Sequence, residues 1–293
     1  MNQSFFFYDL ETSGINPREQ RIMQFAGQRT NLELQPIGEP VNMLIALGDD
    51  VLPDPDAILV TGITPQSTKQ DGITEVEFLR VFYEQVAMPG TIFVGYNTVR
   101  FDDEFMRYLN YRNFYDPYEW HWQDGKSRWD LLDVVRMTRA LRPEGIKWPF
   151  TSDGKPTNRL ELLTELNGLE HQNAHDALSD VDATIALAEL IRNHQPKLFD
   201  YLLKMRNKSE VENLIKSSKP FVYTSGKYSN ETEKTAVTVY LCDNPKTGAL
   251  VYDLRFSPAD WFDKTPEQLA EAWKWKQDSS EPRLPIKTLQ YNR

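Results

Sequence analysis

The sequence predicts an α/β domain followed by a smaller, strand-rich domain, and three observations support this fold class. The aromatic run at residues 5–8 is typical of a buried strand. Strand and helix patterns then alternate as far as residue 205. Beyond Pro220, short strand patterns dominate, at 220–223, 235–241 and 249–254. The change in character places a domain boundary between residues 207 and 219.

Two carboxylates come at the end of the first predicted strand. Asp9 and Glu11 are two positions apart, so their side chains project to the same face of a strand. Like charges at one spot raise each other's pKa, and a divalent cation removes that cost. Among cations, Mg²⁺ and Mn²⁺ suit hard oxygen ligands. An Asp-x-Glu also arises by chance in a chain with 43 acidic residues, but here a turn follows it, where α/β folds gather ligands.

A second strand, predicted at 91–96, leads into a helical pattern that contains Phe105 and Leu109. Asp102 lies near the start of this helix and is a further candidate ligand. Asp103 and Glu104 follow directly, and the alternative, that a first helical turn favours acidic residues, explains two of these three charges on its own.

A third block precedes and opens a helix predicted at 176–191. Asp176 is the expected cap, and Asp180 lies one turn into the helix. His175 stands just before the helix and can face the same position as Asp180 only from the entering loop. A histidine beside a helix start is often a structural hydrogen bonder, whereas beside assembled carboxylates it is a candidate general base.

The segment 100–159 contains eleven basic residues interleaved with aromatic ones. Base stacking on exposed rings tolerates any sequence, so this composition indicates a path for a single strand. The alternative is that many of the rings are core and that the basic residues pair with nearby acids such as Asp130 and Asp133. Because the whole chain carries a formal net charge of −10, any contact with nucleic acid has to be local.

The lone Cys242 excludes an intramolecular disulfide, and the N-terminus lacks the pattern of a signal peptide. We find no apolar run long enough to cross a membrane, so the expected location is the cytoplasm. In the second domain, residues 244–248 carry the signal of a hairpin turn. Thr265 and Gln268 form a predicted capping box that opens a helix reaching Trp275.

The order Asp-x-Glu, a middle Asp after a Tyr-Asn strand end, and His-x-x-x-x-Asp resembles the DEDDh exonuclease superfamily. Longer stretches resemble the bacterial exodeoxyribonuclease I family within it. These stretches are Gly62-Ile63-Thr64-Pro65, Arg100-Phe101-Asp102-Asp103-Glu104, Tyr111-Arg112-Asn113-Phe114-Tyr115-Asp116-Pro117-Tyr118, Ser127-Arg128-Trp129-Asp130-Leu131-Leu132-Asp133 and Leu141-Arg142-Pro143-Glu144-Gly145-Ile146.

The resemblance implies an RNase H-like exonuclease domain, with a mixed central sheet flanked by helices, at residues 1–206. A linker at 207–219 would follow, and then a partial SH3-like β domain at 220–293. The family's helical C-terminal extension would be absent from this chain, which leaves processivity open.

The activity implied is 3′ to 5′ degradation of single-stranded DNA to 5′-mononucleotides in DNA repair and recombination. Asp9, Glu11, Asp102 and Asp180 would hold two Mg²⁺ ions, with Mn²⁺ as an alternative. Glu11 and His175 would be the catalytic residues, His175 by deprotonating the attacking water. The residues that match the family's contacts to the strand are Arg107, Tyr118, Trp122, Arg136 and Arg159.

The resemblance further implies a monomer, with no membrane partner. Arg142 and Tyr201 match the surface on which the family binds the C-terminal tail of single-stranded-DNA-binding protein. Two other functions stay open: a related exonuclease that acts on RNA or in proofreading, and a catalytically weak module that only binds single strands.

Overall fold

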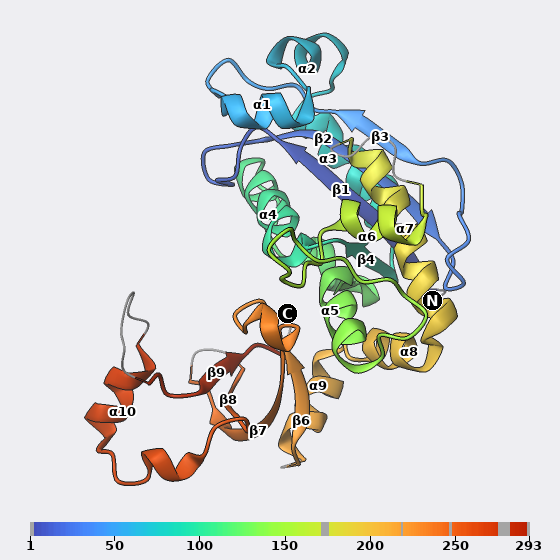
Figure 1. Ribbon diagram of the computed structural model, residues 1–293. Coiled ribbons are helices and arrows are strands. Elements are labelled where there is room, and N and C mark those ends of the chain that lie inside the picture. Colours follow the sequence, from blue (N-terminus) through green and yellow to red (C-terminus); the bar gives the residue numbers. More distant parts are fainter. Residues whose placement is uncertain (1–2, 171–175, 218, 246–247, 275–281, 292–293) are drawn as a thin grey trace. The chain divides into compact units, whose positions relative to one another are not determined.

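The computed structural model describes residues 3–170, 176–217, 219–245, 248–274 and 282–291. They form two compact units, residues 1–203 and 204–293. Each unit is built on its own sheet (Figure 1).

The first unit contains a five-stranded sheet in the order β3-β2-β1-β4-β5. Its strands are β1 (Ser4–Thr12), β2 (Ile22–Thr30), β3 (Val41–Leu44), β4 (Thr91–Gly95) and β5 (Ser127–Asp130). Strand β1 runs antiparallel to β2 and parallel to β4, which in turn is parallel to β5. The sheet is therefore mixed, as the family resemblance implied.

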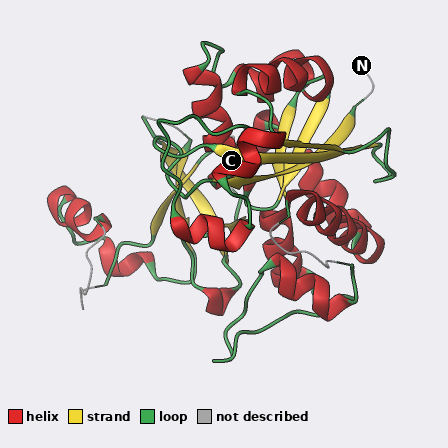
Figure 2. Cartoon of the chain, turned by 90° about the horizontal axis from the view of Figure 1, so that it is seen from above, coloured by secondary structure: helices red, strands yellow, loops and turns green. Residues whose placement is uncertain are grey.

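Helices cover both faces of this sheet (Figure 2). They are α3 (Glu75–Val81) and α4 (Asp102–Arg112) on one face, and α5 (Leu131–Leu141), α6 (Leu160–Asn167), α7 (Ala177–His194) and α8 (Pro196–Lys204) on the other. Two short helices, α1 (Pro55–Thr61) and α2 (Pro65–Asp71), contribute no described residue to these two core clusters. A π-helical turn at Phe82–Val86 follows α3, and short 3₁₀ turns lie at Thr98–Arg100, Glu119–His121 and Gln123–Gly125.

Successive side chains of β1 point to opposite faces of the sheet, and the apolar core of the first unit accordingly forms two clusters. Phe5 and Phe7 pack with residues of α5, α7 and α8, whereas Phe6 and Tyr8 pack on the other face of the sheet. Helix α7 packs against β1 and β2. Because side chains two apart share a face, Asp9 continues the row of Phe5 and Phe7 toward α7.

The second unit contains a four-stranded antiparallel sheet in the order β6-β7-β8-β9. Its strands are β6 (Phe221–Thr224), β7 (Thr235–Asp243), β8 (Ala249–Asp253) and β9 (Ile286–Leu289), and its helices are α9 (Lys208–Lys216) and α10 (Pro266–Trp273), with 3₁₀ turns at Asn230–Thr232 and Pro258–Trp261. Ile215, Phe221 and Val251 lie in its apolar core.

Two details of the second unit bear on the predictions. Residues 207–219, for which the sequence predicts a linker, contain helix α9. The capping box predicted at Thr265 is confirmed, because Gln268 N donates to Thr265 Oγ1 and Gln268 Oε1 accepts from Thr265 N. Among the described residues, no helix combines the length and the apolar character needed to span a bilayer.

Candidate metal centre

The candidate centre is a group of three carboxylates drawn from β1 and α7. Asp9 and Glu11 lie two apart on β1, and Asp180 lies in the first turn of α7. One carboxylate oxygen from each of the three lies within 4.8 Å of the other two. The structure therefore brings together two blocks that lie about 170 residues apart in the sequence, and each of the three residues was predicted to be a ligand.

The carboxylates repel one another in the metal-free protein. Burial raises the pKa of Glu11 to about 9, and the charges of Asp9, Asp180 and Asp176 add to the effect. Burial also raises the pKa of Asp9 well above its usual value, with Asp102 as the strongest neighbouring charge. A bound divalent cation would offset this repulsion, and clustered carboxylate oxygens are suitable ligands for one. The three residues could thus hold a metal ion.

Asp102, the fourth predicted ligand, begins helix α4 and is 3% exposed. Burial raises its pKa, and the charges of Asp103, Asp130 and Glu11 raise it further. These charge interactions with Asp9 and Glu11 indicate that Asp102 lies close to the group of three.

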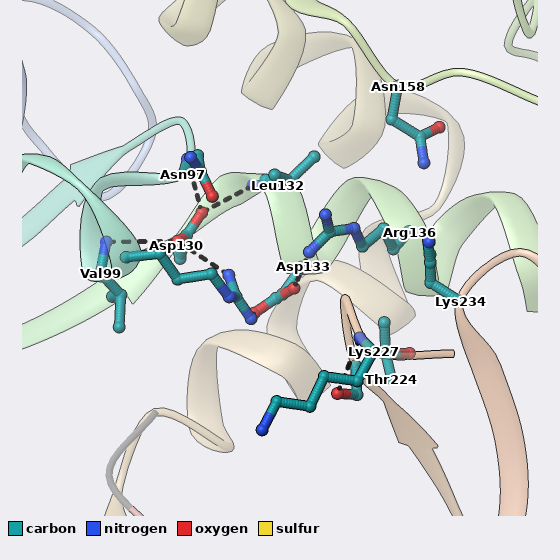
Figure 3. A network of polar contacts seen from close by, with 12 residues as sticks. Asn97, Val99, Asp130, Leu132, Asp133, Arg136, Asn158, Thr224, Lys227 and Lys234 are labelled. Carbon is teal, nitrogen blue, oxygen red and sulfur yellow. Dashed lines mark hydrogen bonds and ion pairs between the residues drawn. The ribbon is translucent and has the colours of Figure 1, made fainter. Parts of the chain in front are cut away.

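The turn that delivers Asp102 is held by Asp130, the last residue of β5. Asp130 Oδ1 accepts hydrogen bonds from the backbone N–H groups of Asn97, at 2.9 Å, and Leu132, at 3.1 Å. Asp130 Oδ2 accepts from Val99 N at 3.3 Å (Figure 3). Asn97 adopts a left-handed conformation with φ of 70°, which asparagine tolerates better than most residues. Asp130 thus fixes the chain just before Asp102.

Replacing Asp130 with alanine should destabilise the protein. The change removes the cap of α5 and leaves buried N–H groups without an acceptor, so we expect a loss of about 2 to 4 kcal/mol in the free energy of unfolding. Urea denaturation measures it. Asp133→Ala is the matched control, because Asp133 is partly exposed and pairs with Arg100 and Arg136. Equal losses in the two variants would contradict the role of Asp130.

Asp103 and Glu104 are not ligands in this arrangement. Asp103 is 2% exposed, accepts a hydrogen bond from Tyr8 Oη and forms an ion pair with Arg128. Glu104 forms an ion pair with Arg107 on the same helix. The favourable position in a first helical turn explains Glu104, whereas Asp103 has a buried structural role that this alternative does not describe.

Helix α7 is anchored near the centre by Asp176. Its Oδ1 accepts from Ser179 N at 3.1 Å, which confirms the predicted cap. Gln24 Nε2 donates to Asp176 Oδ2 at 3.4 Å, and Gln24 lies opposite Glu11 in the β1–β2 register. Gln24 thus connects the strand pair to the start of α7. His175, the predicted general base, lies outside the described residues.

The predicted strand contacts occupy several elements of the first unit. The Arg107 guanidinium lies 4.8 Å from the centre of the Tyr118 ring, so these two residues are together. Tyr118 and Trp122 are 48% and 57% exposed. Arg136 donates to Asp133 at 2.8 Å, and Arg159 pairs with Glu161.

The alternative interpretation of the basic and aromatic segment is correct for part of it. Trp120 and Trp129 are buried in the core. Arg100 pairs with both Asp130 and Asp133. The exposed rings of Tyr118 and Trp122 are not explained in this way.

The raised pKa of Glu11 leads to a test of the metal-free protein. An acid whose pKa is higher in the folded state destabilises that state as pH rises from the unfolded pKa, near 4.5, to the folded value of about 9. In EDTA, Glu11→Gln should therefore stabilise the chain increasingly across this range and have no such effect at lower pH.

Thermal unfolding of wild type and Glu11→Gln at several pH values measures this difference. Exposed Glu19 supplies the control variant Glu19→Gln, for which no pH-dependent gain is expected. Saturating Mg²⁺ should reverse the order, because the wild-type carboxylate then has a cation to bind. A difference that is constant with pH would show that the carboxylates do not interact.

Comparison with known proteins gives family matches for both units. Residues 6–188 match the Exonuclease family, and residues 206–293 match the family described as Exonuclease I SH3-like domain. Exodeoxyribonuclease I of Haemophilus influenzae is 50% identical over 229 residues, which are 78% of this chain and 48% of that protein. The chain spans about half the length of the curated relatives it matches.

Solved structures agree with these matches. Escherichia coli Exonuclease I in complex with a dA16 oligonucleotide has a TM-score of 0.94 and 43% identity, covering 99% of this chain and 63% of the other. An ExoI/SSB-Ct complex has a TM-score of 0.93 and 41% identity, covering 100% and 64%.

Proposed function

We infer the function of this chain from its family, because it belongs to the exonuclease family and is a homologue of exodeoxyribonuclease I. We propose that it removes 5′-mononucleotides from the 3′ end of single-stranded DNA, in DNA repair and recombination. The observation that carries this proposal is the group formed by Asp9, Glu11 and Asp180, with Asp102 close by. We keep the predicted division into an exonuclease domain at 1–206 and an SH3-like domain at 220–293 as part of it.

The four carboxylates would hold two divalent cations, and Mg²⁺ or Mn²⁺ fits their oxygen donors. Such ions supply charge neutralisation at the scissile phosphate and a lowered pKa for bound water. The protein's own task is to fix the ligands. Strand β1 sets the spacing of Asp9 and Glu11, α7 sets Asp180, and Asp130 fixes the turn before Asp102.

His175 would accept the proton of the attacking water, since it immediately precedes the Asp176 cap of α7. Glu11, the most buried carboxylate of the group of three, would orient that water as well as bind metal. Both roles need the water near the group of three.

The single strand would follow the residues that match the family's contacts. Arg107 and Arg136 would meet phosphates, and Tyr118 and Trp122 would guide or stack bases. Arg159, which is well exposed, would add a further cationic contact. The solved E. coli relative with a dA16 oligonucleotide supports this class of substrate.

Arg107→Ala should weaken binding to all base sequences alike. A phosphate contact carries no sequence information, and removing it should lower the slope of log K against log salt by about 0.7. Fluorescence anisotropy with oligothymidylate and oligoadenylate measures both effects, with exposed Arg80 giving the control Arg80→Ala. Weaker binding confined to one base would contradict the phosphate role.

A protein partner is part of the proposal. Arg142 and Tyr201 would receive the C-terminal tail of single-stranded-DNA-binding protein, as the ExoI/SSB-Ct complex of a relative suggests. Arg142 is exposed and Tyr201 is 43% exposed, so both are accessible within the first unit.

Degradation of a 5′-labelled single strand in Mg²⁺ tests the proposed function. A ladder of shortening products from single-stranded DNA, with no ladder in EDTA and none from matched duplex, is expected. Efficient degradation of matched RNA would favour the RNA-directed alternative, and binding without cleavage would favour the module that only binds strands.

A further inference from the structure

Three elements of the first unit meet at the buried carboxylate of Asp103. The Tyr8 hydroxyl, from β1, donates to Asp103 Oδ1, and the Arg128 guanidinium, from β5, donates to Asp103 Oδ2. Asp103 itself lies in the first turn of α4 and is 2% exposed. Its two oxygens thus connect the start of α4 to two strands of the sheet. We call Tyr8, Asp103 and Arg128 the Asp103 network.

The Asp103 network borders the carboxylate centre through the backbone. Tyr8 immediately precedes Asp9, and Asp103 immediately follows Asp102. Successive residues of a strand point to opposite faces of the sheet, so Tyr8 and Asp9 project to opposite sides of β1. The hydrogen bond from Tyr8 to Asp103 therefore joins the two chain segments that carry Asp9 and Asp102.

The sheet fixes both partners of Asp103. The centre of the Tyr8 ring lies 6.1 Å from the ring centres of both Phe25 and Phe93, and Tyr8 is 3% exposed. Arg128 lies opposite Phe93 in the β4–β5 register, so these two side chains leave the sheet from the same face. The hydroxyl and the guanidinium thus reach Asp103 from well-packed positions.

The start of α4 lacks the usual side-chain cap. Its N-cap residue is Phe101, whose apolar side chain cannot accept a hydrogen bond from the first helical turn. The Phe101 backbone is also irregular, with φ of −129° and ψ of −75°. Asp130 holds the chain just before Asp102, through Asn97 and Val99. Asp103 holds it just after Asp102, so the two anchors lie on either side of this predicted ligand.

We propose that Asp103 is a positioning residue which, through Tyr8 and Arg128, sets the place of Asp102 relative to Asp9 and thereby the affinity of the centre for divalent cations. The three residues of the network act through their neighbours and are not themselves ligands. The inference deepens the proposed function and rests on it, because it concerns the same centre. If the network only stabilised the fold, metal affinity would not depend on it.

The variant Tyr8→Phe removes one hydroxyl and keeps the packing of the ring, so it should fold. Tyr83→Phe is the matched control. Tyr83 packs against the same apolar cluster as Tyr8, and its hydroxyl donates to Asn110 Oδ1 at 2.6 Å. Asn110 lies near the other end of α4. Each variant therefore loses one tyrosine hydrogen bond to α4, but only Tyr8 contacts the turn beside Asp102.

The measurement is Mn²⁺ binding by the full chain with thymidine 5′-phosphate, followed by electron paramagnetic resonance of the free ion. Tyr8→Phe should raise the Mn²⁺ concentration that half-fills the centre roughly 3- to 10-fold, the effect of one ordinary hydrogen bond. Asp103→Asn also loses the ion pair with Arg128 and should raise it roughly 10- to 100-fold. Tyr83→Phe should bind as the wild type does. Equal Mn²⁺ affinities in Tyr8→Phe and Tyr83→Phe would overturn the proposal.

A double-mutant cycle with Asp102→Asn separates positioning from general stability. If the network acts through Asp102, Tyr8→Phe should have little effect on the Mn²⁺ binding that remains once Asp102 is replaced. Thermal unfolding in EDTA checks that each variant is folded. A loss of Mn²⁺ affinity of the same size with and without Asp102 would assign the network to the fold alone and overturn the inference.

Cleavage of single-stranded DNA by the wild type keeps this inference distinct from the proposed function. If the wild type binds Mn²⁺ but degrades no strand, the proposed function fails, whereas weaker Mn²⁺ binding by Tyr8→Phe still supports the positioning role. If the wild type degrades the strand and Tyr8→Phe binds Mn²⁺ as tightly as the wild type, the proposed function stands and the positioning role is overturned.

Discussion

Asp180→Asn should abolish cleavage of single-stranded DNA while leaving binding of the strand intact. Asparagine keeps the size of the side chain but removes the charge that a divalent cation needs. Asp180 is also the residue through which α7 completes the group on β1, so the two strand carboxylates cannot replace it. The loss corresponds to several kcal/mol of transition-state stabilisation, or roughly 10³-fold or more in turnover.

Single-turnover cleavage and equilibrium binding measure the two parts of this prediction. Removing one of several clustered negative charges should leave strand affinity equal or slightly higher, because the phosphate backbone is itself negative. Asp182→Asn is the matched control on the same helix, since Asp182 is outside the group of three. Appreciable turnover by Asp180→Asn would show that the metal assignment is wrong.

His175→Ala should lower turnover by roughly 10² to 10⁴, the usual contribution of a general base. The residue immediately precedes Asp176, whose side chain caps α7 and accepts from Gln24 beside Glu11. His175 is therefore next in sequence to a residue that contacts the strand pair at the centre. Metal binding should persist in this variant, because the carboxylates are unchanged.

The pH profile separates a general base from a structural histidine. With the wild type, turnover should rise as the histidine loses its proton, and this limb should disappear in His175→Ala. His194→Gln, in the last turn of α7, is the control for the loss of a histidine from this region. A rate that is unchanged in His175→Ala would assign the residue a structural role only.

Local patterns predicted the parts of the site that depend on neighbours in sequence. The two-residue period of β1 was sufficient to place Asp9 and Glu11 on one face, and helix-capping chemistry was sufficient to identify Asp176 and Thr265. No local pattern assigns Asp180 to the same site as the two strand carboxylates. That assignment depended on the family resemblance. The α/β fold class followed from a different pattern, the alternation of predicted strands and helices along the chain.

The rest depended on tertiary contacts that no local pattern contains. Gln24 contributes to the site because the β1–β2 register places it opposite Glu11. As a polar residue, it interrupts the apolar pattern by which its strand would be recognised in the sequence. Asp130 acts on backbone groups more than 30 residues earlier in the chain. Asp103 is buried because Tyr8 and Arg128, from two different strands, both reach it.

The most direct test of the central claim is a count of the Mn²⁺ ions that bind to the chain, by titration calorimetry with electron paramagnetic resonance of the free ion. We predict two ions for the wild type in the presence of the thymidine 5′-phosphate product, and a marked loss of binding in Asp180→Asn. Equally weak binding by the wild type and Asp180→Asn would contradict the assignment of Asp9, Glu11, Asp102 and Asp180 as a metal centre.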